Sequence, residues 1–184
     1  MLHPGLRALT EKGAIVSNRV RAAAWAAMIA VLVAAHMALD PRLGVRVPCL
    51  PCRVAGLALL AVVLRAAAVT GRYLAVYGKP RGGRFGEIER LVREGPYGCM
   101  RHPMHLFLSM FPLSVALLLC SPAAIAAAIA EMILILVMAV KVDERESLAR
   151  FGEEYERYRR EVPAFNLSPR CLWLALARRP SKRR

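Results

Sequence analysis

The sequence predicts an all-α, polytopic membrane protein with four transmembrane helices and a C-terminal amphipathic helix. First, 57% of its 184 residues are hydrophobic and the mean hydropathy is +0.40, yet 27 Lys and Arg stand against 13 Asp and Glu. Soluble domains of this size rarely combine such hydropathy with so much charge. Second, the apolar residues come in blocks, while the charges lie between and after them. That layout is typical of helices whose solvent is the bilayer.

The net charge of +14 is interpreted as loops and a tail that face anionic lipid. The basic residues are spread through loops and are not interleaved with aromatic residues on one element, as nucleic-acid-binding surfaces usually are. We therefore expect membrane lipids as partners and no nucleic acid.

We expect a single membrane domain over residues 1–184, divided where polar and apolar composition alternate. Its parts are a basic cytoplasmic leader (1–21), two N-terminal spanning helices (22–77), a core (78–169) and a basic tail (170–184).

Residues 22–39 form the first predicted spanning helix, because an apolar run of about 20 residues crosses the hydrocarbon core. Asp40 and Pro41 end it and open a loop to residue 53 that carries the CxxC motif Cys49-Leu50-Pro51-Cys52. A redox pair or half of a metal site is one interpretation of this motif. Since no second CxxC follows, a fortuitous pair or an occasional disulfide is favoured, and no metal site is predicted.

The second predicted span, 54–77, is interrupted by Arg65 and Arg72, which share one helical face. Arg72 can reach the nearer interface, whereas Arg65 lies near the middle of the run and needs a partner. Glu131 lies in the middle of the last apolar run, 123–140. Since each charge alone is costly at mid-bilayer, we predict that Arg65 and Glu131 approach one another. A structural ion pair is favoured over a catalytic role.

Two short apolar runs, 104–119 and 123–140, are separated only by the turn 120–122 and therefore predict an antiparallel helical hairpin. The distribution of basic residues predicts that both termini and the loop over 78–101 face the cytoplasm, with the short turns facing outward. The arginines of the loop over 40–53 argue mildly against this orientation.

Residues 141–162 predict a charged helix with one apolar and aromatic stripe, because its large side chains recur at intervals of three and four. Glu144 lies on the same face as this stripe. We expect the face to pack on the loop that holds Tyr97 and His102; a helix lying on the lipid surface is the alternative. The stripe consists of Leu148, Phe151, Tyr155, Tyr158 and Val162.

Polar motifs flank the predicted hairpin in a specific order. Gly95-Pro96-Tyr97 and Arg101-His102-Pro103 precede it, and Asp143-Glu144 and Phe151-Gly152-Glu153-Glu154-Tyr155 follow it. This order, over roughly residues 88–169, resembles that of the integral-membrane methyltransferases, which include isoprenylcysteine carboxyl methyltransferase and the phospholipid N-methyltransferases.

The resemblance implies a methyltransferase that uses S-adenosylmethionine, held at the cytoplasmic side between the loop and the helix after the hairpin. A lipophilic small molecule or a lipid-modified substrate, accepting methyl at a carboxylate, amine or thiol, would enter sideways from the membrane. Carried over residue by residue, the catalytic set is His102, Glu144 and Arg101. The cofactor-binding set is Leu91, Val92, Gly95, Tyr97, His102, Pro103, His105, Asp143 and Glu144.

The functional groups of S-adenosylmethionine require binding partners of the same residue types. Arg101 and His102 can meet its carboxylate, and Asp143 and Glu144 can meet its ammonium and ribose groups. Tyr97 can provide an aromatic wall for the sulfonium. Positioning and exclusion of water contribute most to such a transfer. A carboxylate acceptor needs no base, whereas for an amine or thiol His102 or Glu144 could take the proton.

Three positions depart from the family pattern: His105 stands where Tyr is usual, Asp143 where Glu is common and Ala164 where Arg is frequent. The alternatives are a catalytically degenerate membrane scaffold of the same fold and, less favoured, an oxidoreductase similar to membrane sterol reductases. An enzyme requires Tyr97, His102 and Glu144 to converge around one cavity, whereas a scaffold does not.

Overall fold

The computed structural model describes residues 18–44, 48–78, 88–177 and 180. The regular elements of this part are helices, and it contains no strand. The α-helices are α2 (Asn18–Leu43), α3 (Cys49–Tyr73), α4 (Pro103–Leu108), α5 (Phe111–Leu119), α6 (Pro122–Met138), α7 (Glu144–Phe151), α8 (Glu153–Glu161) and α9 (Pro169–Leu176). Two π-helical turns, η1 (Leu74–Gly78) and η3 (Ala139–Asp143), extend α3 and join α6 to α7, and a 3-10 turn, η2, covers Gly95–Gly98.

Several sequence predictions fall outside the described residues. These are most of the basic leader (1–17), residues 45–47 of the loop over 40–53, residues 79–87 of the loop over 78–101 and the last basic residues of the tail (178–179 and 181–184).

Three helical stretches are long and apolar enough to cross a membrane: Ala22–Leu43, Cys49–Gly78 and Pro122–Phe151. The span predicted over 104–119 corresponds to the shorter apolar stretch Pro103–Leu119, which is divided into α4 and α5 at Ser109. An all-helical protein with three helices of spanning length is therefore established, and a fourth crossing remains a prediction.

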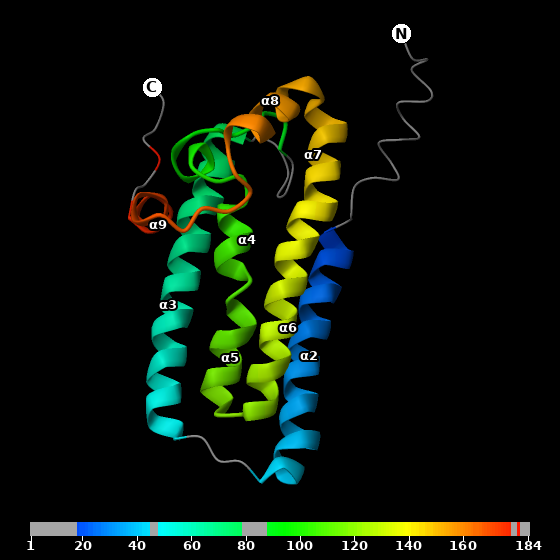
Figure 1. Ribbon diagram of the computed structural model, residues 1–184, viewed down its shortest axis with the longest axis vertical. Coiled ribbons are helices and arrows are strands. Elements are labelled where there is room, and N and C mark those ends of the chain that lie inside the picture. Colours follow the sequence, from blue (N-terminus) through cyan, green and yellow to red (C-terminus); the bar gives the residue numbers. More distant parts are fainter. Residues whose placement is uncertain (1–17, 45–47, 79–87, 178–179, 181–184) are drawn as a thin grey trace.

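The helices α2, α3, α4–α5 and α6 stand side by side along the long axis, and the predicted hairpin of α4–α5 with α6 is present (Figure 1). The turn from α5 to α6 lies at the same end of the bundle as the start of α3. The opposite end holds η2, α7 and α8 (Figure 1). The motifs before and after the hairpin therefore meet at one end, which positions the candidate site.

The described residues of the predicted loop over 40–53 are mostly helical, which corrects the first two helix boundaries. Pro41 lies inside α2, and the helix ends only at Leu43, before Gly44, whose φ of +63° suits a glycine after a helix. Cys49 and Cys52 form the first turn of α3, where Pro51 is tolerated because N–H groups of a first turn lack helical acceptors anyway.

The prediction that Arg65 and Glu131 approach one another is wrong. Arg65 Nε instead donates a hydrogen bond of 2.9 Å to the carbonyl of Leu176, at the end of α9. The last carbonyls of a helix lack intrahelical donors, so a guanidinium from the neighbouring α3 satisfies one of them. Glu131 is 7% exposed, and its carboxylate has no hydrogen-bond partner among the described residues.

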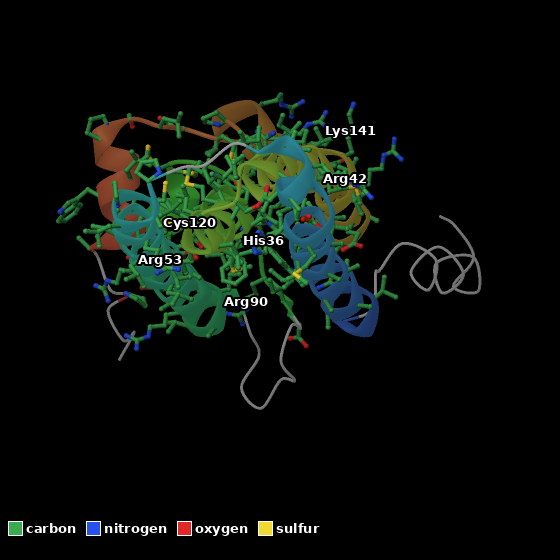
Figure 2. The ribbon with its side chains drawn as sticks, turned by 90° about the horizontal axis from the view of Figure 1, so that it is seen from below. His36, Arg42, Arg53, Arg90, Cys120 and Lys141 are labelled. Atoms are coloured by element: carbon green, nitrogen blue, oxygen red, sulfur yellow. A yellow bond between two sulfur atoms is a disulfide. The ribbon has the colours of Figure 1, made fainter. Side chains whose placement is uncertain are left out.

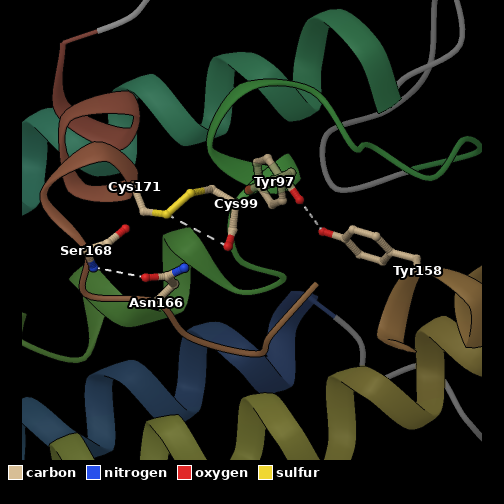
Figure 3. Close-up of a disulfide and its surroundings, with 6 residues drawn as sticks. All are labelled: Tyr97, Cys99, Tyr158, Asn166, Ser168 and Cys171. Atoms are coloured by element: carbon tan, nitrogen blue, oxygen red, sulfur yellow. Dashed lines mark hydrogen bonds between the residues drawn. A yellow bond between two sulfur atoms is a disulfide. The ribbon is translucent and has the colours of Figure 1, made fainter. Parts of the chain in front are cut away.

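The charged helix predicted over 141–162 is divided. Gly152 adopts a φ of +54° and separates α7 from α8, so the chain turns over the end of the bundle at this residue. The tail predicted from residue 170 begins as a packed helix, α9, because Ala175 is buried against Ala66 and Phe107. A disulfide between Cys99 and Cys171, which the scattered cysteines did not suggest, ties α9 to the loop after η2 (Figure 3).

Candidate active site

A glycine sets the shape of the turn that opens the site. Gly95 has a φ of +59°, and a Cβ placed on it would lie 2.3 Å from the ring of Tyr73. Only glycine combines that backbone conformation with so close an approach. The turn buries Pro96, whose carbonyl accepts the N–H of Met100, and it buries Tyr97 beside Tyr73 and Val92.

The next two residues are held by a returning segment of the chain. Arg101 N–H donates to the carbonyl of Pro163 at 2.9 Å, and His102 N–H donates to that of Ala164 at 3.1 Å. Ala164, one of the departures from the family pattern, therefore contributes its backbone. Pro103 then starts α4, which fixes the direction of the His102 side chain.

Glu144 is the centre of the polar cluster. Its side chain is 7% exposed, and Oε1 accepts hydrogen bonds from Arg101 Nε at 3.0 Å and Nη2 at 2.5 Å. The same oxygen lies 3.2 Å from His102 Nε2. A buried carboxylate is stable only with such charge-assisted partners, so α7 and the loop before α4 are joined by this ion pair.

A second acid–histidine pair lies beside the first. His105 Nε2 is 2.9 Å from Asp143 Oδ2, and the rings of His102 and His105 are 5.7 Å apart. Each of the two histidines thus faces one of the two adjacent acidic residues. His105 and Asp143, two of the departures from the family pattern, form one of these pairs.

Aromatic residues form the layer above the cluster. The hydroxyl of Tyr158 donates a hydrogen bond of 2.6 Å to the carbonyl of Tyr97 (Figure 3). The hydroxyl of Tyr97 is buried and has no hydrogen-bond partner among the described residues. Leu91 packs on the cluster of Tyr155 and Tyr158. Every residue of the predicted cofactor-binding set therefore lies in one region, around η2, the start of α4 and the η3–α7 junction.

Burial controls the protonation of these groups. Desolvation, together with the neighbouring His105, lowers the pKa of His102 below its usual 6.5, although Glu144 opposes this shift. His102 is therefore neutral at pH 7, and because Nε2 faces the Glu144 carboxylate we assign the proton to Nε2 and the lone pair to Nδ1. Desolvation also raises the pKa of Tyr97, and it raises that of Tyr155 to about 12, so both phenols stay protonated.

Two cavities lie near the cluster, and neither is lined by Tyr97, His102 or Glu144, the residues that the enzyme prediction places around one cavity. One, of about 660 Å³, extends from Gly95 to α9 and is also lined by Val162 and Pro163. The other, of about 330 Å³, is an apolar groove along α6 that ends at Lys141 and Phe165. The Phe165 ring also lies 5.9 Å from the ring of His102, so this residue links the groove to the cluster.

Sequence reasoning missed the residues that act through the backbone or through a distant contact. Arg101 and His102 are held by the carbonyls of three consecutive residues, Val162, Pro163 and Ala164. No side-chain pattern predicts that role. Phe165 carries only a weak signal, as a large apolar residue just after the returning segment.

Comparison with known protein families places this arrangement in a family. A family model described as phospholipid methyltransferase matches residues 51–154, which is more than half of the chain and runs from α3 into α8. The matched stretch includes η2, the Arg101–Pro103 motif and the acidic pair. No curated protein and no solved structure matches the chain.

Proposed function

The chain belongs to the phospholipid methyltransferase family of membrane methyltransferases, and from this premise we propose that it transfers a methyl group from S-adenosylmethionine to a lipophilic acceptor. The observation that carries the proposal is the convergence of Arg101, His102 and Glu144 within hydrogen-bonding distance at one end of the bundle. Glu144 lies 42 residues after His102 in the sequence, and the fold brings a cation, an imidazole and a carboxylate together in a buried place.

The residues present fit this cofactor. The buried hydroxyl of Tyr97 lacks a partner among the described residues, which leaves a donor and acceptor available for a ligand. Arg101 and His102 would hold the carboxylate, and Asp143 and Glu144 the ammonium or ribose hydroxyls. The glycine at position 95 leaves the edge of the larger cavity open. When bound, S-adenosylmethionine supplies an electrophilic methyl group on a sulfonium.

The protein's own part is positioning, desolvation and proton handling. The Arg101–Glu144 ion pair fixes α7 against the loop, and the tyrosines exclude water from the cluster. His102 is neutral, and its Nδ1 can accept a proton from an amine or thiol acceptor. A carboxylate acceptor needs no base, so the same site serves it by orientation alone.

The apolar groove along α6 supports a lipophilic acceptor. Its lining is almost entirely apolar, formed by Ile133, Leu136, Val137, Val140 and Phe165 with the stem of Lys141. An acceptor approaching from the bilayer along this groove reaches Phe165 and then His102. Four crossings, with the site and both termini on the cytoplasmic side, remain part of this proposal.

One observation favours a second function, a scaffold that keeps the fold without the activity. Arg101 and Glu144 satisfy one another, and Arg101 also donates to the carbonyls of Arg159 and Val162, so the cluster is stable without a ligand. The two functions differ in whether methyl is transferred.

The test is transfer of a radiolabelled methyl group from S-adenosylmethionine into the organic extract of membranes that contain the protein. The enzyme predicts label in a lipid fraction and a loss of about 100-fold or more for Glu144→Gln, because misplacing the reacting groups is costly. Glu156→Gln, the same change at an exposed position of α8, is the matched control. Labelling by the wild type no higher than that of membranes without the protein would favour the scaffold.

A further inference from the structure

Three free cysteines gather at the end of the bundle opposite the methyltransferase site. Cys49 and Cys52 form the first turn of α3, and Cys120 follows the last residue of α5. Figure 2 views the molecule from this end and labels Cys120 together with Arg53, the residue after Cys52. The thiol cluster, as we name these three residues, plays no part in the function proposed above.

Contacts across two helices define the cluster. Cys120 Sγ lies 3.4 Å from the carbonyl oxygen of Cys49, to which the thiol donates. The Cys120 thiol therefore lies beside Cys49. Cys49 is exposed, whereas Cys52 and Cys120 are half-buried, so a reagent from solution reaches Cys49 first.

The backbone at Cys120 is a second, independent observation. Its φ of 54° and ψ of 38° are left-handed, and it is the one non-glycine residue with positive φ in the described ranges. The position just after a helix is where glycine is usually found, because a side chain costs free energy there. A cysteine in this conformation indicates that its thiol has a use that offsets the cost.

Close packing fixes the distance between the two helix ends. A Cβ on Gly56 of α3 would lie 3.0 Å from the carbonyl oxygen of Ser114 and 3.1 Å from Leu117 Cβ, so α3 and α5 touch at their backbones. On the other side of the turn, Asp40 accepts the N–H of Ala123 at 3.0 Å and Ser121 caps α6. Cys120 is held from both sides, so its thiol stays beside Cys49.

We propose that the thiol cluster is a thiol–disulfide exchange site that reacts with small soluble disulfides and closes a Cys49–Cys120 bond. The exposed Cys49 thiolate attacks one sulfur of the small disulfide, forms a mixed disulfide and releases one small thiolate. The Cys120 thiolate then attacks Cys49 Sγ and releases the second. Two protein thiols are oxidised and one small disulfide is reduced to two thiols, which take up the two protons that the protein thiols lose.

Metal binding is a weaker interpretation of the same residues. In the portion of the chain that the structure describes, no group of three or more His, Cys, Asp or Glu side chains is arranged to hold a metal ion. A disulfide needs only two facing sulfurs, and the resulting bond would link α3 to the turn between α5 and α6.

The experiment treats the detergent-purified full chain with oxidised glutathione, quenches with acid, alkylates the remaining thiols and maps the linked peptides by mass spectrometry. The Cys99–Cys171 disulfide serves as an internal reference. We expect a Cys49–Cys120 peptide, a single alkylated cysteine at Cys52 and an upward shift of the thermal midpoint.

Two variants make the outcome specific. Cys120→Gly suits the left-handed backbone and should fold, yet oxidation should stop at glutathione attached to Cys49. Cys52→Ala is the matched control and should still form the link. A Cys49–Cys52 link in the wild type, three thiols that remain alkylatable, or loss of the Cys49–Cys120 link in Cys52→Ala would each overturn the proposal.

Discussion

At the scale of single residues, one carboxylate organises the site. Glu144 Oε1 accepts from Arg101 and lies against His102, so a residue after the hairpin fixes two residues before it. The sequence suggested this meeting, because the stripe of the C-terminal helix carries Glu144 on its packing face. The partner of Arg65 could not be predicted, since it is a backbone carbonyl of a helix that lies far along the chain.

The lowered pKa of His102 predicts the acid limit of the reaction. If His102 accepts the proton of an amine or thiol acceptor, the acid limb of kcat/KM should lie below pH 6.5, because the buried imidazole stays neutral to a lower pH than a free one. The pH profile of methyl transfer measures this. The same shift makes the folded protein less stable as pH falls below 6.5, since unfolded chains then bind the proton more tightly.

The variant His102→Gln separates these effects. It should remove the acid limb together with most of the activity while keeping a polar side chain in place. An acid limb at or above pH 6.5, or one that persists unchanged in the variant, would rule out His102 as the base.

At the scale of elements, the turn η2 depends on a glycine that has no room for a side chain. Gly95→Ala places a methyl group 2.3 Å from Tyr73 in a left-handed backbone, so we expect a loss of about 1–3 kcal/mol of stability. The thermal midpoint in detergent measures it. Methyl transfer should fall as well, because η2 positions Tyr97.

Gly71→Ala is the matched control within α3. A Cβ there meets nothing within 4 Å, and alanine suits a helix better than glycine, so the midpoint should stay constant or rise. Equal effects of the two substitutions would show that the conformation of Gly95 has no special importance.

Element boundaries were the least predictable feature. The apolar stripe over 141–162 predicted one helix, but Gly152 divides it, and a glycine within a periodic pattern does not reveal whether the helix continues. Prolines around the CxxC motif predict a loop, yet Pro48 caps α3 and Pro51 is compatible with its first turn. The packed helix α9 was not predicted, because the basic residues that follow it made the whole segment resemble a surface-binding tail.

At the scale of the whole molecule, hydropathy and charge predicted the class of the protein. Blocks of apolar residues predicted spanning helices, and three of adequate length are present. The order of motifs around the hairpin predicted the family, which the family match confirms. The number of membrane crossings was harder to predict, because the stretch from Pro103 to Leu119 is short and interrupted.

The orientation of the bundle makes a further prediction. If the site faces the cytoplasm, the thiol cluster at the opposite end faces outward, and a membrane-impermeant maleimide should label Cys49 in intact cells. Cys49→Ala should reduce the labelling. Labelling that appears only after the cells are opened would reverse the assigned orientation.

The central claim is that the Arg101–His102–Glu144 cluster belongs to a site for S-adenosylmethionine. Calorimetric titration of this cofactor into the detergent-purified protein tests it most directly. We predict saturable binding that His102→Ala and Glu144→Ala abolish while the helical content and monodispersity of the protein are retained. No binding by the intact, monodisperse protein, or binding that both variants leave unchanged, would contradict the claim.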